Sequence, residues 1–196
     1  MPRDLSQKEL AFLVDQRISL MWVYSRLRGE SLHESIASMR INDKYVLHGF
    51  MKCNCGIALL SRKGDCINCY PKQLEVIHRY TETGYIYVLC SSKTGIIKVG
   101  STGLTPEART AQLNKAGYAG ARDWWVCDFV RVTRRAVLED QLKVALRPHF
   151  IEVPYTRNGH NTYSRETYAC SAATAQIALK RLQRGYIKRH RRIQSS

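Results

Sequence analysis

Four side chains in the second half of the sequence could together cleave a phosphodiester bond, and they are Tyr87, Lys98, Arg109 and Glu139. Such cleavage needs an activated water, stabilisation of charge on the phosphate and help for the departing oxygen. A tyrosine hydroxyl has a reference pKa of about 10, but a nearby ammonium group and a divalent cation both favour the phenolate. Tyr87 beside Lys98 is therefore a candidate general base. Arg109 is a candidate phosphate clamp, and Glu139 is a candidate ligand for Mg²⁺ or Mn²⁺.

Each of these residues also has a purely structural interpretation. Tyr87 suits the core of a strand, Lys98 the solvated end of a strand, and Arg109 the surface of a helix. Glu139 and Lys143 have the i,i+4 spacing of an ion pair that stabilises a helix. Taken singly, the structural roles are the commoner ones. The catalytic hypothesis rests on the occurrence of the four residues together, in one order and on one pattern of elements.

The segments that carry Tyr87 and Lys98 predict a β-hairpin. Residues 85–90 and 96–100 are rich in β-branched and aromatic residues, and the polar residues between them favour a turn. Neighbouring strands lie about 5 Å apart, so the two side chains can meet if the register of the strands agrees.

The segments that follow predict helices and a third strand. Thr105-Pro106-Glu107 is a typical helix start, and Gly117 is a good helix end. A strand is expected over residues 124–132, and the helix that carries Glu139 should end before Pro148. The predicted fold class is therefore α/β, with a small three-stranded antiparallel sheet flanked by helices.

This arrangement resembles the GIY-YIG nuclease superfamily, in its phage-type branch, where the first motif often reads Gly-Tyr-Ile-Tyr-Val-Leu. Tyr85-Ile86-Tyr87 takes the position of the first motif and Lys98-Val99-Gly100 that of the second, with the typical spacing of eleven residues from Tyr87 to Lys98. The resemblance covers residues 84–170 or so. It implies that Arg109 is the helix arginine of the family and Glu139 its metal-binding glutamate.

The resemblance further implies a DNA endonuclease of a phage or mobile element that leaves 5′-phosphate and 3′-hydroxyl ends. Arg165-Glu166-Thr167-Tyr168 looks like the segment that closes the domain in this branch. Two positions depart from the pattern. Lys98 replaces the second tyrosine, a replacement that the superfamily tolerates, and Lys143 stands where the branch often has a histidine. Because of these departures an alternative hypothesis stays open beside the endonuclease, a non-catalytic nucleic-acid-binding protein that retains the nuclease fold.

Four residues near the motifs are accessory candidates. Tyr85 and Gly100 belong to the two motifs themselves, whereas Tyr118 and His149 are candidate proton carriers.

A cluster of four cysteines predicts a structural zinc site. Cys53-x-Cys55 and Cys66-x-x-Cys69 supply four thiolates in two close pairs, and structural zinc takes four ligands in a tetrahedron. The first pair has one intervening residue, fewer than usual, which makes His48 an alternative ligand. The competing interpretation is a set of reduced surface cysteines.

The other three cysteines are expected to be separate core residues, and they are Cys90, Cys127 and Cys170. An odd total of seven cysteines, in a chain whose first residues lack the apolar core of a secretory signal, argues against a disulfide scaffold. Because no run of about 18 apolar residues occurs, a membrane span is not expected. We expect a cytoplasmic protein.

The charge of the chain indicates a polyanionic partner. Thirty-one Lys and Arg residues face sixteen Asp and Glu residues, for a formal net charge of +15. DNA is the expected partner, RNA a weaker alternative, and a membrane surface is disfavoured because the basic end lacks large apolar anchors. Trp124 and Trp125 could stack on an unpaired base, although neighbours on a strand point in opposite directions. The residues expected to contact the nucleic-acid backbone are Lys180, Arg181, Arg184, Lys188, Arg189, Arg191 and Arg192.

The sequence suggests four segments: a helical segment over 1–45, a four-cysteine zinc module over 46–73, a GIY-YIG-like nuclease domain over 84–185 and a basic tail over 186–196. In the first segment we expect one helix over 5–28 and a second that opens at Ser31, with Glu34 completing a capping box. This pair is either a DNA-reading helix-turn-helix or a simple helical hairpin.

The remaining segments carry weaker signals. A short strand is expected over 44–50, a connector over 71–84, a polar loop over 154–165 and a last helix over 172–183.

Overall fold

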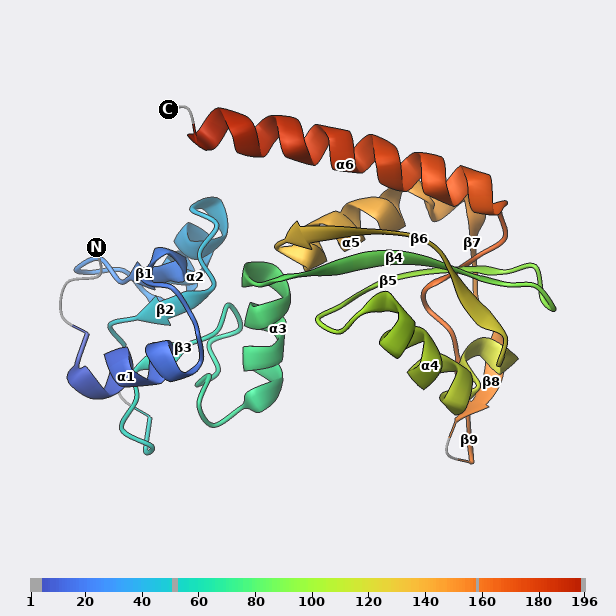
Figure 1. Ribbon diagram of the computed structural model, residues 1–196. Helices are drawn as coiled ribbons and strands as arrows, with labels where there is room; N and C mark the ends of the chain where they lie inside the picture. Colours follow the sequence, from blue (N-terminus) through green and yellow to red (C-terminus); the bar gives the residue numbers. More distant parts are fainter. Residues whose placement is uncertain (1–4, 51–52, 158, 195–196) are drawn as a thin grey trace. The chain divides into compact units, whose positions relative to one another are not determined.

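The computed structural model describes residues 5–50, 53–157 and 159–194, and in the last helix it describes side chains up to Tyr186. The chain forms two compact units, Met1–Thr81 and Glu82–Ser196, whose helices and strands are labelled in Figure 1. The cysteine cluster belongs to the same unit as the N-terminal helices. The C-terminal basic residues belong to the same unit as the predicted nuclease domain.

The first unit contains a small mixed sheet surrounded by short helices. Strand β1 pairs in parallel with β2, and β2 pairs antiparallel with β3. Its core gathers apolar residues from distant parts of the segment, among them Leu13, Val46, Ile67 and Ile77. In chain order the elements are α1 (Gln7–Asp15), η1 (Leu20–Trp22), β1 (Val23–Ser25), α2 (Leu32–Ile41), β2 (Val46–His48), β3 (Leu59–Leu60) and α3 (Pro71–Thr81).

The single helix expected over 5–28 is wrong, because α1 ends at Asp15. Arg17 adopts a φ of 53°, and the Ile18 amide donates to the Leu13 carbonyl at 2.8 Å. Such a left-handed residue ends a helix. The chain then enters β1, so α1 and α2 do not form the expected helix pair. The predicted capping box at Ser31 and Glu34 is confirmed.

The connector expected over 71–84 is also wrong, because residues Pro71–Thr81 form α3. Leu74, Ile77 and Tyr80 recur at the spacing of a helix face and pack on the core of the first unit. Pro71 stands at the first helical position, which it fits because its fixed φ is already helical.

The second unit is built on a five-stranded antiparallel sheet of order β6-β4-β5-β10-β7. The predicted hairpin, the third strand and the two helices after the hairpin are present. In chain order the elements are β4 (Thr83–Ser91), β5 (Ile97–Thr102), α4 (Pro106–Ala116), η2 (Tyr118–Gly120), β6 (Trp124–Thr133), α5 (Arg135–Ala145), η3 (Arg147–His149), β7 (Phe150–Ile151), β8 (Pro154–Arg157), β9 (His160–Tyr163), β10 (Thr167–Tyr168) and α6 (Ala172–Gln194).

Alternation along β4 and β5 divides the sheet into two faces. Ile86, Val88 and Val99 join one apolar core with residues of α5 and α6. Tyr87 and Leu89 point the other way and join a second core with residues of α4 and β6. Figure 1 shows α5 and α6 on one side of this sheet and α4 on the other.

The expected three-stranded sheet is wrong in its number of strands. Strands β7 and β10 contain two residues each and extend the sheet beyond β5. Such short strands show no alternation in a sequence, so only tertiary pairing reveals them. The polar loop expected over 154–165 contains a separate two-stranded hairpin, β8–β9.

The last helix is longer than expected, since α6 runs from Ala172 to Gln194. Lys and Arg are good helix formers, and Leu182 and Tyr186 pack on the core of the second unit. The segment expected as a basic tail therefore continues this helix as far as Gln194.

Cys90 and Cys127 are joined by a disulfide between β4 and β6, contrary to the expectation of separate core cysteines. The β4–β6 register shifts between Val88 and Leu89, and the two Cα atoms lie 6.1 Å apart, within the usual range for a disulfide. This shift in register cannot be predicted from the spacing of the cysteines along the sequence.

Only one of the two neighbouring tryptophans is buried, as predicted, because Trp124 is 3% exposed and Trp125 is 50% exposed.

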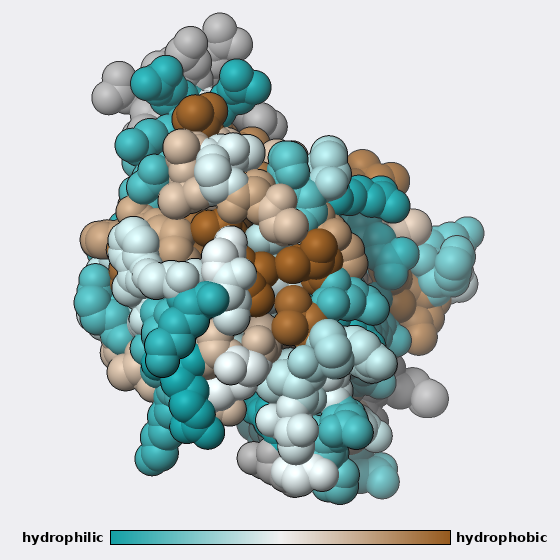
Figure 2. Space-filling view, turned by 90° about the vertical axis from the view of Figure 1, so that its right-hand side faces the viewer, coloured by the Kyte–Doolittle hydropathy of each residue, from teal (hydrophilic) through white to brown (hydrophobic). Residues whose placement is uncertain are grey.

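Figure 2 shows the second unit from the side of the β4–β5 turn, with hydrophobic residues near the centre of the view and hydrophilic residues around them. A hollow of about 230 Å³ lies between this turn and the start of α6, lined by residues that include Ile96, Trp125 and Cys170. None of its described lining residues is charged. None of the described helices combines the length and apolar character that a membrane crossing requires.

Glu9 of α1 is 2% exposed and accepts hydrogen bonds from the Ala58 amide at 2.9 Å and the Ser6 amide at 2.8 Å. Burial raises the pKa of Glu9, but these bonds outweigh it and leave the pKa below its ordinary value. A lowered pKa stabilises the fold above the ordinary value of 4.5, and the contribution is lost as the pH falls below it.

Glu9→Gln should therefore lower the free energy of unfolding of the first unit by about 1–3 kcal/mol at neutral pH. Denaturant unfolding at a series of pH values should show the difference from wild type shrinking as the pH falls from about 6 to about 3. The exposed Glu75→Gln is the control. A difference that does not depend on pH would contradict this account.

Candidate active site and zinc centre

The register of β4 and β5 sets Tyr87 opposite Gly100 and Lys98 opposite Leu89. Tyr87 and Lys98 are thus diagonal neighbours on one face of the sheet rather than a direct pair. A Cβ atom at Gly100 would lie 2.6 Å from the Tyr87 hydroxyl oxygen. The phenol ring therefore occupies the space that any other residue at position 100 would fill.

Tyr87 is 1% exposed, and burial raises its pKa to about 12. Arg109 of α4 acts against burial, because its guanidinium group lies beside the hydroxyl and favours the phenolate. The structure thus brings together the candidate base and the candidate phosphate clamp. Arg109 also donates to the side chain of Gln112 at 3.0 Å.

Lys98 is also 1% exposed, which rules out a solvated strand end. Its Nζ atom lies 2.5 Å from Glu166 Oε2 and 4.5 Å from the centroid of the Tyr118 ring. The Tyr87 ring centroid is 5.9 Å from the same atom. A buried ammonium group needs such a partner, because its desolvation is otherwise very costly.

Glu139 is buried at the middle of α5. Its Oε1 atom lies 2.6 Å from Lys143 Nζ, and its Oε2 atom accepts a hydrogen bond from the Ser101 hydroxyl on β5. Lys143 Nζ is in turn 2.8 Å from Glu166 Oε1. The predicted i,i+4 ion pair of Glu139 and Lys143 exists. It is part of a larger polar group, formed by Lys98, Arg109, Glu139, Lys143 and Glu166.

Glu166 is the residue that joins the two halves of this polar group, and sequence reasoning did not select it as a site residue. Burial raises its pKa, but Lys98 and Lys143 outweigh burial and lower the pKa to about 2. Glu166 is therefore a carboxylate at neutral pH. Its position in the segment that resembles the end of the family domain was the one available signal.

The charges of the group leave a surplus of one positive charge. Lys98, Lys143 and Arg109 are basic, whereas Glu139 and Glu166 are the acidic members. Such a surplus favours a phosphate group.

The accessory candidates differ in their relation to this group. Tyr118 contacts Lys98 through its ring, and burial raises its pKa while Lys98 opposes the rise. Tyr85 lies two residues before Tyr87 on β4, where its ring packs edge-on against the ring of Phe129, with 5.8 Å between the two ring centroids. His149 lies in η3, where its carbonyl accepts from the Ala169 amide. Among the described residues, no hydrogen bond or ion pair joins the His149 side chain to the group.

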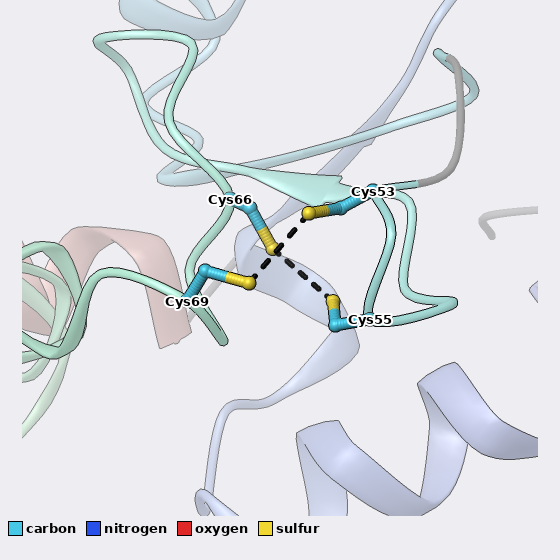
Figure 3. Close-up of side chains that lie close together, drawn as sticks. All are labelled: Cys53, Cys55, Cys66 and Cys69. Atoms are coloured by element: carbon cyan, nitrogen blue, oxygen red, sulfur yellow. Dashed lines mark hydrogen bonds between the residues drawn. The ribbon is translucent and has the colours of Figure 1, made fainter.

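The four cysteines of the first unit converge as predicted. Figure 3 shows their side chains pointing toward one another, and all four sulfur atoms lie within 4.8 Å of each other. Cys53 and Cys69 have sulfur atoms 3.6 Å apart, as do Cys55 and Cys66. Sulfur ligands in a tetrahedral zinc site, each about 2.3 Å from the metal, are separated by about 3.8 Å. The four thiols fit a zinc ion.

His48 is not needed as a ligand, because its Nε2 atom lies 3.7 Å from Glu9 Oε2 and the four cysteines form a complete set. Burial raises the pKa of Cys55, but hydrogen bonds with Asn68 and the Ile57 backbone lower it to about 6. The pKa of Cys69 moves the other way, to about 12, because of its hydrogen bonds with the neighbouring cysteines, so Cys55 is the thiol of this pair that more readily becomes the thiolate that zinc binds.

The candidate backbone-binding residues are partly described. Lys180, Arg181 and Arg184 are exposed along α6, and Lys180 lies 3.8 Å from Asp128. The side chains of Lys188, Arg189, Arg191 and Arg192 lie outside the described part of the helix.

The model of one protein family matches the chain. It is the T5orf172 domain, and the match covers residues 84–183. These residues include the five-stranded sheet from β4 onward and the whole polar group around Glu166. No curated protein and no solved structure gave a significant match.

We predict that the purified chain contains about one zinc ion and that Cys69→Ser loses it. The first unit should then melt at a lower temperature, since zinc binding contributes to folding. Metal analysis and thermal melting followed by circular dichroism measure both effects. Cys170→Ser, in the second unit, is the matched control and should retain zinc. Equal zinc content in both variants would contradict the assignment.

Gly100→Ala should lower the free energy of unfolding of the second unit by about 1–3 kcal/mol, because the new methyl group overlaps the Tyr87 hydroxyl. Gly103→Ala is the control, since the nearest atom to its Cβ would be 3.8 Å away. Denaturant unfolding compares the two variants. Equal stability would show that Tyr87 does not require the glycine.

Proposed function

The chain belongs to the T5orf172 domain family, a phage-associated group related to nucleases, and from this premise we propose that it is a metal-dependent DNA endonuclease of the GIY-YIG type. The observation that carries the proposal is the convergence of Tyr87, Lys98, Arg109 and Glu139 on one polar group with surplus positive charge.

In this proposal Tyr87 is the general base that takes a proton from the attacking water. Arg109 lies beside its hydroxyl, and Lys98 lies on the same face of the sheet. The positive charge of Arg109 favours the phenolate over the phenol, whereas the carboxylates of Glu166 and Glu139 oppose it. The guanidinium group of Arg109 would also bind the non-bridging phosphate oxygens, because its planar donors match their geometry.

Glu139 would hold the divalent cation, Mg²⁺ or Mn²⁺. The Glu139 carboxylate is a suitable ligand, since such hard cations bind carboxylate oxygens and keep several water ligands. When bound, the metal would stabilise the negative charge on the departing 3′ oxygen.

The basic face of α6 supports a nucleic-acid substrate. Lys180, Arg181 and Arg184 are exposed on one helix of the same unit as the polar group. Contacts of this kind bind the phosphate backbone without reading its sequence, and their strength falls with salt. The net charge of +15 agrees with this role. RNA is the alternative polymer.

One observation favours a second function, a nucleic-acid-binding protein that has kept the fold without cleavage. Tyr87 is 1% exposed and its pKa is raised to about 12, so almost all of it is phenol at neutral pH. A base in this state requires the approach of the metal and substrate before it can act.

Nicking of supercoiled plasmid in Mg²⁺ or Mn²⁺ tests the proposal. Wild type should nick, and Glu139→Ala and Tyr87→Phe should each reduce the rate by about a hundredfold or more. Below its pKa, the phenolate fraction of Tyr87 rises about tenfold per pH unit, so the wild-type rate should increase from pH 7 to pH 9. Residual activity of Tyr87→Phe should lack this slope.

Glu152→Ala, at an exposed position between β7 and β8, is the control and should nick like wild type. Binding without nicking, on both duplex and single-stranded DNA and with either metal, would support the non-catalytic function instead.

A further inference from the structure

The ammonium group of Lys143 lies between two carboxylates of the candidate site. Its Nζ atom is 2.6 Å from Glu139 Oε1 and 2.8 Å from Glu166 Oε1. Helix spacing accounts for the contact with Glu139, which is one turn away on α5. It does not account for the contact with Glu166, which comes from the segment before β10. The ammonium group of Lys143 is thus held by carboxylates from two separate elements, as a bound metal ion would be.

Lys143 also covers Glu139. The Glu139 side chain is 2% exposed, whereas that of Lys143 is 28% exposed. Toward the sheet, Glu139 Oε2 accepts a hydrogen bond from the Ser101 hydroxyl of β5. Oε1, the other oxygen, faces the ammonium group. A cation that binds Glu139 Oε1 therefore has to take the position of the Lys143 ammonium group.

We propose that Lys143 is a built-in competitor for the divalent cation at Glu139, so that the metal binds only when the ammonium group leaves Oε1. This inference rests on the proposed function in one respect, that Glu139 is the metal ligand. An ammonium group and a divalent ion on the same oxygen would repel each other strongly at this short distance and low exposure. Either one or the other occupies the oxygen.

The exchange requires little rearrangement. Lys143 can give up Glu139 and keep Glu166, its second partner at 2.8 Å. The side chain is partly exposed, and its flexible stem allows the charged end to turn toward solvent or toward a phosphate. The competitor thus lowers the affinity of the free protein for metal without closing the site, and an incoming phosphate offers the displaced ammonium group a new partner.

Direct binding of Mn²⁺ tests this role without any need for cleavage. The full chain is loaded with zinc and titrated with Mn²⁺, while electron paramagnetic resonance follows the free ion. Lys143→Met removes the charge and keeps the length of the side chain, and should lower the dissociation constant at least about tenfold. Lys143→Gln is the second variant, and circular dichroism checks that both are folded. Lys115→Met, at an exposed position on α4, is the matched control and should bind like wild type.

Two further variants locate the effect. Lys143→Arg keeps the charge and should bind Mn²⁺ no more tightly than wild type. Lys143→Met combined with Glu139→Gln should lose the gain. The proposal is wrong if neither neutral variant binds more tightly, or if the gain persists without the Glu139 carboxylate. A chain that shows these shifts but never cuts DNA would overturn the proposed function and leave the competition at Glu139 standing.

Discussion

A buried ammonium group must have a negative partner, and the candidate site depends on how Lys98 meets this requirement. Its partner, Glu166, precedes β10, whose Thr167 pairs with Lys98 across the strands. The Val99 amide also donates to the Glu166 carbonyl. Pairing of a two-residue strand therefore fixes the carboxylate that neutralises the lysine. The same carboxylate holds Lys143, which in turn contacts Glu139, so the docking of β10 on β5 joins the two lysines in one polar group.

The parts that could be predicted from sequence are those with local causes. Thr105 caps α4 and Gly117 ends it with a φ of 62°, and Ser31 and Glu34 close their capping box. In each case the residues that cause the structure are neighbours in the chain. The convergence of the four cysteines also has a local cause, since only the short loop between the two close pairs has to close to bring the four sulfur atoms together.

The parts that could not be predicted have distant causes. Arg17 ends α1 in a left-handed conformation that arginine seldom adopts. The residue types around it therefore do not predict that the helix ends here. The diagonal placement of Tyr87 and Lys98 depends on the register, which the two strand sequences leave open. Glu166 was placed in the resembling segment, yet its role as the bridge between two lysines follows from contacts 23 and 68 residues away in the chain.

The β8–β9 hairpin lies outside the main sheet, since its two strands pair with each other. A ring contact between Tyr155 and Tyr118, 5.4 Å between centroids, links it to the polar group. A segment attached in this way can change in length and composition during evolution while the sheet keeps its geometry. Descendants of this fold can therefore diversify the surface that they offer to a partner and inherit the charged centre unaltered.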